Sequence, residues 1–146
     1  MRFSIRRRKA DILFSQYLRK KRGYTCEKCG AKHESNSKNL GVSHFWGRAK
    51  ETTRYDTENC DVLCNWPCHN YFETHRTEYK EWKKARMGEK SYNLLDFRAH
   101  QLGKRQDEQV ILWVQHELKK LAGEQEKEYS KSACPAGTRL KGSRKG

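Results

Sequence analysis

The sequence predicts an α+β fold, in which a small metal-stabilised core of two strands and a helix lies between N-terminal and C-terminal helices. Three observations support this class. Four of the six cysteines fall into two close pairs, a spacing typical of metal-binding turns. Two short runs, "GVSHFW" and "CDVLC", are plausible strands, and the second of them ends at Cys64. The flanking segments carry apolar residues at helical spacing.

Length and composition indicate one folded unit with polar ends. The chain has 146 residues, of which 34% are hydrophobic and 34% are charged, so it can bury one modest core. We expect a basic, partly loose arm over residues 1–9 and a zinc-knuckle domain over 10–88. A helical extension over 89–122 and a disordered basic tail over 123–146 complete the predicted organisation.

The charge balance favours a polyanionic partner. Lys and Arg number 32 against 18 Asp and Glu, which gives a net charge of +14 spread over the whole chain. Such a field attracts nucleic acid, whereas a basic surface that serves only solubility needs a few charges. No run approaches 18 apolar residues, and the basic start lacks an apolar core and a cleavage site. We therefore expect a cytoplasmic, uncleaved protein that does not bind membranes.

The N-terminal half combines a helix, a metal-binding turn and the first strand. The segment "KADILFSQYLRKK" places Leu13, Phe14, Tyr17 and Leu18 on one side of a helix that ends near Gly23. The motif "YTCEKCG" then has the composition of a metal knuckle. A polar connection, "AKHESNSKNLG", leads to "GVSHFW", which is a plausible strand.

The second half contains one more strand and then helices. After the loop "GRAKETTRYDTEN", the run "CDVLC" predicts the second strand. Helix-forming residues extend from His69 to Met87, where Gly88 follows as a stop. Two further helices are expected around "YNLLDFRAHQL" and "DEQVILWVQHELKKLAG". The apolar residues of this last segment are expected to pack or to pair in a homodimer; they are Val110, Leu112, Trp113, Leu118 and Leu121.

The two cysteine pairs predict a structural zinc site. Tetrahedral zinc takes four thiolates, and close pairs supply them two at a time. Cys26 and Cys29 form a CxxC motif, and Cys64 and Cys68 are separated by "NWP", within the tolerated spacing. Cys60 is interpreted as a buried thiol, with a role as an alternative ligand left open, and Cys134 as a bystander. Zinc binding would contribute on the order of 10 kcal/mol to folding.

Three further polar residues suggest chemistry beyond a structural zinc site. His44 lies in the first predicted strand, Asn59 opens the second and His69 begins the following helix. Each alone is weak evidence, but their order along strand, strand and helix matches a ββα arrangement that clamps one divalent ion.

In these features the chain resembles the HNH endonuclease family. The resemblance covers about Tyr24 to His75 and depends on "CEKC", "SHF", "RYDTENCDVLC" and "CH". It resembles most the phage-type members, to which the NinG (Rap) recombination proteins are related. The resemblance implies a ββα-metal core, a role in phage DNA recombination or processing, and a location in the bacterial host cytoplasm.

The resemblance also implies roles for individual residues. His44 matches the general base that activates water, Asn59 the residue that holds the loop and orients this base, and His69 a ligand of the catalytic ion. A neutral imidazole is a suitable base near pH 7, and Mg²⁺, Mn²⁺ or a similar ion would stabilise the charge that develops at phosphorus. Many members have an acidic ligand where this chain has Ser43. Glu73, one helical turn after His69, is the candidate replacement, with Asn70 and His75 as alternatives.

The loop between His44 and Asn59 supplies candidate DNA contacts. Arg48, Lys50 and Arg54 are expected to reach phosphates beside the scissile bond, and Asp56 to cap the loop or pair with Arg54. The sequence contains no obvious recognition helix, so sequence preference should be weak and binding should fall steeply with salt.

Three functions remain open from the sequence. The favoured one is a metal-dependent DNA endonuclease with a separate structural zinc. The second is a non-catalytic zinc-knuckle DNA-binding protein, in which Ser43 marks a decayed site. The third is a protein-interaction adaptor that docks through the helices after residue 90, and it would leave the charge of +14 unexplained.

Overall fold

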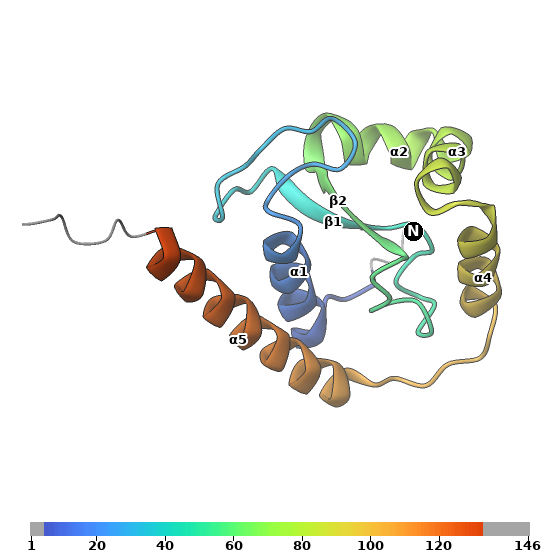
Figure 1. Cartoon of the computed structure of the whole chain (residues 1–146). Coiled ribbons are helices and arrows are strands. Elements are labelled where there is room, and N and C mark those ends of the chain that lie inside the picture. Colours follow the sequence, from blue (N-terminus) through green and yellow to red (C-terminus); the bar gives the residue numbers. More distant parts are fainter. Residues whose placement is uncertain (1–4, 133–146) are drawn as a thin grey trace, which may run out of the picture.

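A small two-stranded sheet lies between helices in the computed structural model, which describes residues 5–132 (Figure 1). Strands β1 (Leu40–His44) and β2 (Cys60–Cys64) pair antiparallel, with His44 opposite Cys60 and Ser43 opposite Asp61. The predicted α+β class and both predicted strands are confirmed. Side chains alternate along β1, so His44 and Ser43 point to opposite faces of the sheet.

Helix α1 (Lys9–Lys21) lies against one face of the sheet, and α5 (Asp107–Ser132) packs along α1 (Figure 1). The predicted apolar stripe of α1 is confirmed, since Phe14, Tyr17 and Leu18 are buried. Trp113 of α5 meets Tyr17 edge to face, with ring centroids 5.1 Å apart. Val114 is the buried residue of α5, whereas Leu112 is exposed.

The opposite face is covered by a bent helical segment. A π-helical turn η1 (Asn65–His69) is followed by α2 (Asn70–Thr74), α3 (Arg76–Met87) and α4 (Glu89–Ala99). The prediction of one continuous helix from His69 to Met87 is wrong, because the backbone leaves helical geometry at His75, with φ −120° and ψ 65°. The stop at Gly88 is confirmed.

The C-terminal boundary also differs from the prediction. Helix α5 continues through Gly123 to Ser132, so the part of the predicted disordered tail over residues 123–132 is helical. The remainder, 133–146, which includes Cys134, lies outside the described residues. One glycine inside a helix costs only about 1 kcal/mol relative to alanine, which is not enough to end a long helix.

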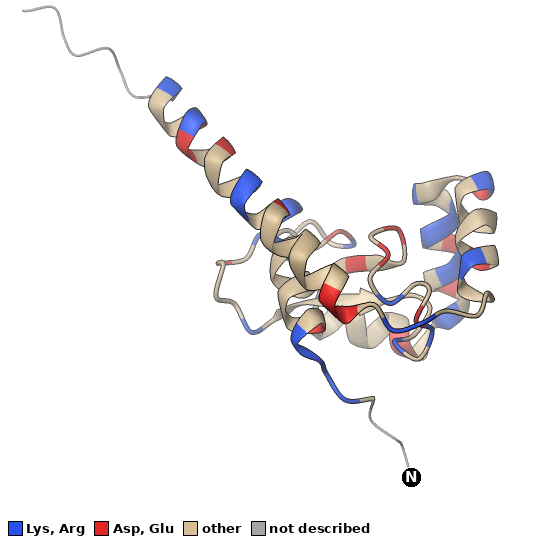
Figure 2. Cartoon of the chain, turned by 90° about the horizontal axis from the view of Figure 1, so that it is seen from below, with Lys and Arg blue, Asp and Glu red and all other residues tan. Residues whose placement is uncertain are grey.

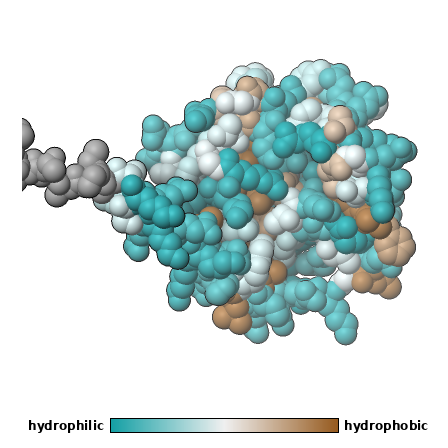
Figure 3. All heavy atoms as spheres, viewed as in Figure 1, coloured by the Kyte–Doolittle hydropathy of each residue, from teal (hydrophilic) through white to brown (hydrophobic). Residues whose placement is uncertain are grey.

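The described surface is strongly polar. Figure 2 shows Lys and Arg along the N-terminal arm, on α3 and α4 and on the distal part of α5. Figure 3 shows a mainly hydrophilic face with a few apolar side chains near α4, where Leu94 and Phe97 are exposed. Within the part of the chain that the structure describes, none of the helices is long and apolar enough to cross a membrane.

Candidate active site and metal centre

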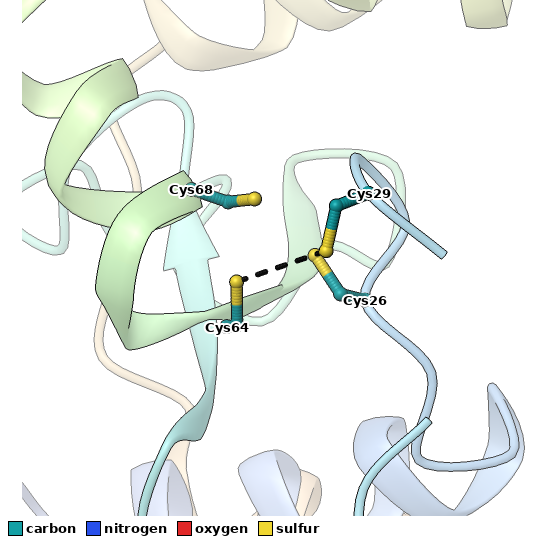
Figure 4. A group of neighbouring side chains, drawn as sticks. All are labelled: Cys26, Cys29, Cys64 and Cys68. Atoms are coloured by element: carbon teal, nitrogen blue, oxygen red, sulfur yellow. Dashed lines mark hydrogen bonds between the residues drawn. The ribbon is translucent and has the colours of Figure 1, made fainter. Parts of the chain in front are cut away.

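The four predicted zinc ligands meet at one point. Cys26 and Cys29 come from the turn after α1, Cys64 ends β2 and Cys68 lies in η1, and Figure 4 shows their side chains converging. The Sγ atoms all lie within 4.8 Å of one another, and those of Cys29 and Cys64 are 3.9 Å apart. Tetrahedral zinc with Zn–S bonds of about 2.3 Å places sulfurs about 3.8 Å apart, so these four cysteines could hold one zinc ion.

The local backbone favours a metal-binding thiolate. Gly30, with φ +76°, closes the turn, and its N–H donates to the Cys26 carbonyl at 2.8 Å. Burial opposes ionisation of Cys26, but hydrogen bonds from backbone N–H groups, those of Cys29 and Cys64 among them, outweigh it and lower its pKa to about 7. Thiolates are the form that binds zinc.

Cys60 stays outside this cluster. It is fully buried in β2, and burial raises its pKa well above the usual thiol range. Its Sγ lies 3.9 Å from the Arg54 carbonyl oxygen, on the sheet rather than at the knuckle. The arrangement agrees with the interpretation of Cys60 as a buried thiol.

Three residues predicted to act in catalysis or to bind its ion line a separate cleft of about 740 Å³. His44, His69 and Glu73 line it, with β1 and one side of α1 forming further walls. His69 Nε2 lies 3.3 Å from a carboxylate oxygen of Glu73, its neighbour one helical turn away. His69 and Glu73 therefore lie side by side, one helical turn apart.

His44 is held in one tautomer. Its Nε2 lies 2.9 Å from the Arg54 carbonyl oxygen, which can only accept, so Nε2 carries the proton. Buried side-chain polar atoms without a partner, among the described residues, are confined to His33, Trp46, Thr52 and Thr53. Nδ1 of His44 also has no hydrogen-bond partner, but it is not one of these buried atoms. It is therefore accessible, and His44 lines the cleft. Burial lowers the pKa of His44 to about 4, which keeps the ring neutral.

Asn59 fastens the loop that follows His44. Its side chain is fully buried, accepts a hydrogen bond from the Trp46 N–H at 2.8 Å and donates to the carbonyls of Trp46 and Thr53. These bonds tie both ends of the 46–53 segment to the start of β2. Asn59 therefore positions the loop, and none of these hydrogen bonds reaches the ring of His44.

The prediction that Arg54 contacts DNA is wrong. Arg54 is completely buried, and its guanidinium donates to the Asp11 carboxylate at 2.9 Å and to the Arg48 carbonyl at 2.9 Å. A buried charge needs such partners, and Asp11 lies 43 positions away, so no local pattern could indicate this pairing. For Asp56 the capping alternative is confirmed, because its carboxylate accepts from the Glu58 N–H at 2.9 Å. Its other oxygen accepts from Arg98 of α4 at 2.8 Å, and not from Arg54.

Of the other two predicted DNA contacts, Arg48 lines the cleft, whereas Lys50 is not among its lining residues. Lys50 Nζ stands 5.6 Å from the centre of the Trp46 ring. Cleft-lining cations that the sequence reasoning missed come from the N-terminal arm, from α1 and from the 31–39 connection; they are Arg7, Arg19 and Lys38. For Arg19, the sequence does contain a signal: polar residues at positions 11, 15 and 19 lie on one face of α1.

Ser43 does not face the cleft. It is buried on the other side of the sheet, where its hydroxyl is hydrogen-bonded to the Tyr79 hydroxyl oxygen at 3.2 Å. Asn70 and His75 are exposed and do not line the cleft. Among the described residues, the four cysteines are the only group of three or more His, Cys, Asp or Glu whose ligand atoms are close enough for a metal.

Comparison of the chain with protein-family models, with curated proteins and with solved structures gave no match.

Proposed function

We propose that this protein is a metal-dependent HNH-type endonuclease that hydrolyses DNA phosphodiester bonds, with the four-cysteine zinc as a structural site. The observation that carries the proposal is the single cleft lined by His44, His69 and Glu73, in which His44 has a fixed tautomer. The resemblance of the motifs around these residues to the HNH family supports the same reaction.

The proposed base is Nδ1 of His44. Because Nε2 donates its proton to the Arg54 carbonyl, Nδ1 has a free lone pair. It accepts a proton from a water molecule as the water oxygen attacks phosphorus. The P–O bond to the leaving oxygen then breaks, and solvent supplies the proton for that oxygen.

The other residues orient and bind. Asn59 fixes the loop that carries Arg48 and the carbonyl that holds His44. His69 and Glu73 would hold the catalytic ion, which when bound supplies positive charge beside the phosphate oxygens. Arg48, at the wall of the cleft, is the proposed contact for a flanking phosphate.

The experiment is nicking of supercoiled plasmid at low salt by the zinc-loaded protein. Reactions with Mg²⁺, Mn²⁺ or Ni²⁺ are compared with a reaction in EDTA that is too brief to remove the structural zinc. Open-circular product that forms only with added ion supports the proposal. Unchanged plasmid with every ion would refute it.

Two observations favour a second candidate, a non-catalytic zinc-knuckle DNA-binding protein. His44, His69 and Glu73 are not close enough to form a metal-ligand group, and Ser43 faces away from the cleft. This candidate predicts that the protein binds the same plasmid in the absence of any cleavage and that His44→Ala has no effect on binding.

A further inference from the structure

The N-terminal arm, residues 5–8, is fastened to the body of the protein on both sides of Arg7. The buried Arg54 guanidinium donates to the Arg6 carbonyl at 3.3 Å. Arg8 donates to Glu51 and to Asp107, both at 3.1 Å, and its N–H caps α1 by donating to Asp11 at 2.7 Å. The arm over residues 1–9 was expected to be partly loose, and its described part is held at Arg6 and at Arg8.

This attachment places Arg7 at the junction of two hollows. Arg8 is extended, with φ −101° and ψ 164°, and neighbouring side chains of an extended segment point in opposite directions. Arg7 lines the cleft that contains His44 and also a second hollow of about 450 Å³. We call this second hollow the arm groove; its lining residues are Ile5, Arg6, Arg7, Arg8, Lys9 and Arg105.

The cations of these two hollows mostly lack anionic partners. Within residues 5–132, Arg6, Arg7 and Lys9 take part in no ion pair, and neither do the other cleft-lining cations Arg19, Lys38 and Arg48. Among the described residues that line the arm groove, none carries a carboxylate. Like charges held side by side repel one another, and a polyanion relieves this repulsion.

Arg54 links the same elements from inside. Its side chain holds the backbone of Arg6 and of Arg48, while its own carbonyl holds the ring of His44. The residue that fixes the proposed base therefore also fixes the backbone beside both Arg7 and Arg48. The backbone near Arg7 and at Arg48 is thus held in place relative to His44 before any ligand binds.

We propose that the arm groove continues the DNA-binding cleft. The phosphate backbone of a duplex cut at His44 passes Arg7 and follows the groove along Arg6 and Lys9 toward Arg105. This inference rests on the proposed function and adds the direction in which the substrate leaves the site. Figure 2 shows the basic arm beside the start of α5, away from the basic residues of α3 and α4.

The test compares two double variants that remove equal charge. Arg7→Gln with Lys9→Gln, the arm variant, alters the lining of the arm groove. Lys80→Gln with Lys90→Gln alters exposed positions of α3 and α4 that form no ion pair among the described residues. Binding of a fluorescein-labelled 24-base-pair duplex is measured by anisotropy from 50 to 200 mM salt with no added divalent ion. Equal unfolding midpoints verify that both variants are folded.

We expect the arm variant to lower the slope of log K against log salt by about 1.8, since each phosphate contact contributes about 0.9. Its affinity at low salt should fall about tenfold or more, and the α3–α4 variant should keep a slope within about 0.5 of the unaltered protein. Equal slopes for the two variants would overturn the proposal. Because no cleavage occurs in this assay, plasmid nicking tests the endonuclease separately.

Discussion

The imidazole of His44 is partly buried, and its Nε2–H donates to the Arg54 carbonyl. Burial lowers its pKa to about 4, whereas a histidine in an unfolded chain titrates near 6.5. Between these values the unfolded state binds one proton more than the folded state. The stability of the fold must therefore decrease as the pH falls from about 6.5 toward 4.

This shift predicts a pH-dependent difference between the protein and a His44→Gln variant. From pH 7 to pH 5, His44 should remove about 2 kcal/mol of unfolding free energy that the variant does not lose. Urea unfolding at the two pH values measures the difference. Parallel losses in both proteins would mean that His44 titrates normally in the folded state.

The two cysteines at the ends of β2 are a second test at the residue scale. Cys64 lies within the four-sulfur cluster and Cys60 does not, although they are four residues apart. Cys64→Ala should lose most of its bound zinc, because three thiolates hold the ion more weakly than four. Cys60→Ala should keep about one zinc per chain. Zinc content measured by atomic spectroscopy distinguishes them, and zinc loss from the Cys60 variant alone would reverse the assignment.

At the scale of elements, α3 is joined to the sheet by a buried polar cluster. Lys83 Nζ lies 2.9 Å from both carboxylate oxygens of Asp61, and the Tyr79 hydroxyl donates to the same carboxylate at 2.6 Å. All three side chains are buried. A buried charge left without its partner is far more costly than the intact pair is stabilising.

Lys83→Met should therefore lower the unfolding free energy by about 3 to 5 kcal/mol, because it leaves the Asp61 carboxylate buried and unpaired by a cation. The double variant Lys83→Met with Asp61→Asn should recover a large part of this loss, since no buried charge remains. Denaturant unfolding of the single and double variants measures both effects. A double variant no more stable than the single one would show that packing, not charge, dominates at this junction.

The bend between α2 and α3 shows where prediction from sequence ends. The region has no proline or glycine, so its composition predicts one helix. Phe72 and Tyr79 stack with centroids 4.4 Å apart, although seven residues of straight helix would separate them by about 10 Å. The break at His75 permits this contact. Tertiary packing of two aromatic rings therefore overrides the local preference.

At the scale of the whole molecule, the two strands and the cysteine cluster follow from local patterns, while the cleft depends on contacts between residues far apart in the sequence. Strand composition and cysteine spacing are local, so β1, β2 and the four sulfurs could be predicted. The burial of Arg54 depends on Asp11 in α1. The position of Arg7 depends on its neighbour Arg8, which pairs with Glu51 and with Asp107 at the start of α5. Such pairings, 43 to 99 positions apart, leave no periodic signal in the sequence.

These distant contacts also connect the candidate site to the helices around it. Arg8 joins the N-terminal arm to the start of α5, and Arg98 joins α4 to the loop residues Asp56 and Glu58. Elements far apart in the sequence thus hold the loop that carries Arg48. The surrounding helices contribute to the shape of the cleft as well as to the core.

The most direct test of the central claim is the initial rate of plasmid nicking by zinc-loaded His44→Ala, measured beside His100→Ala as a matched control on the exposed end of α4. Loss of a general base typically costs about 10² to 10⁴ in rate. We predict a loss of at least about a hundredfold for His44→Ala and no more than about twofold for His100→Ala, with equal zinc content. Nicking by His44→Ala at the rate of the unaltered protein would contradict the assignment of His44 as the catalytic base.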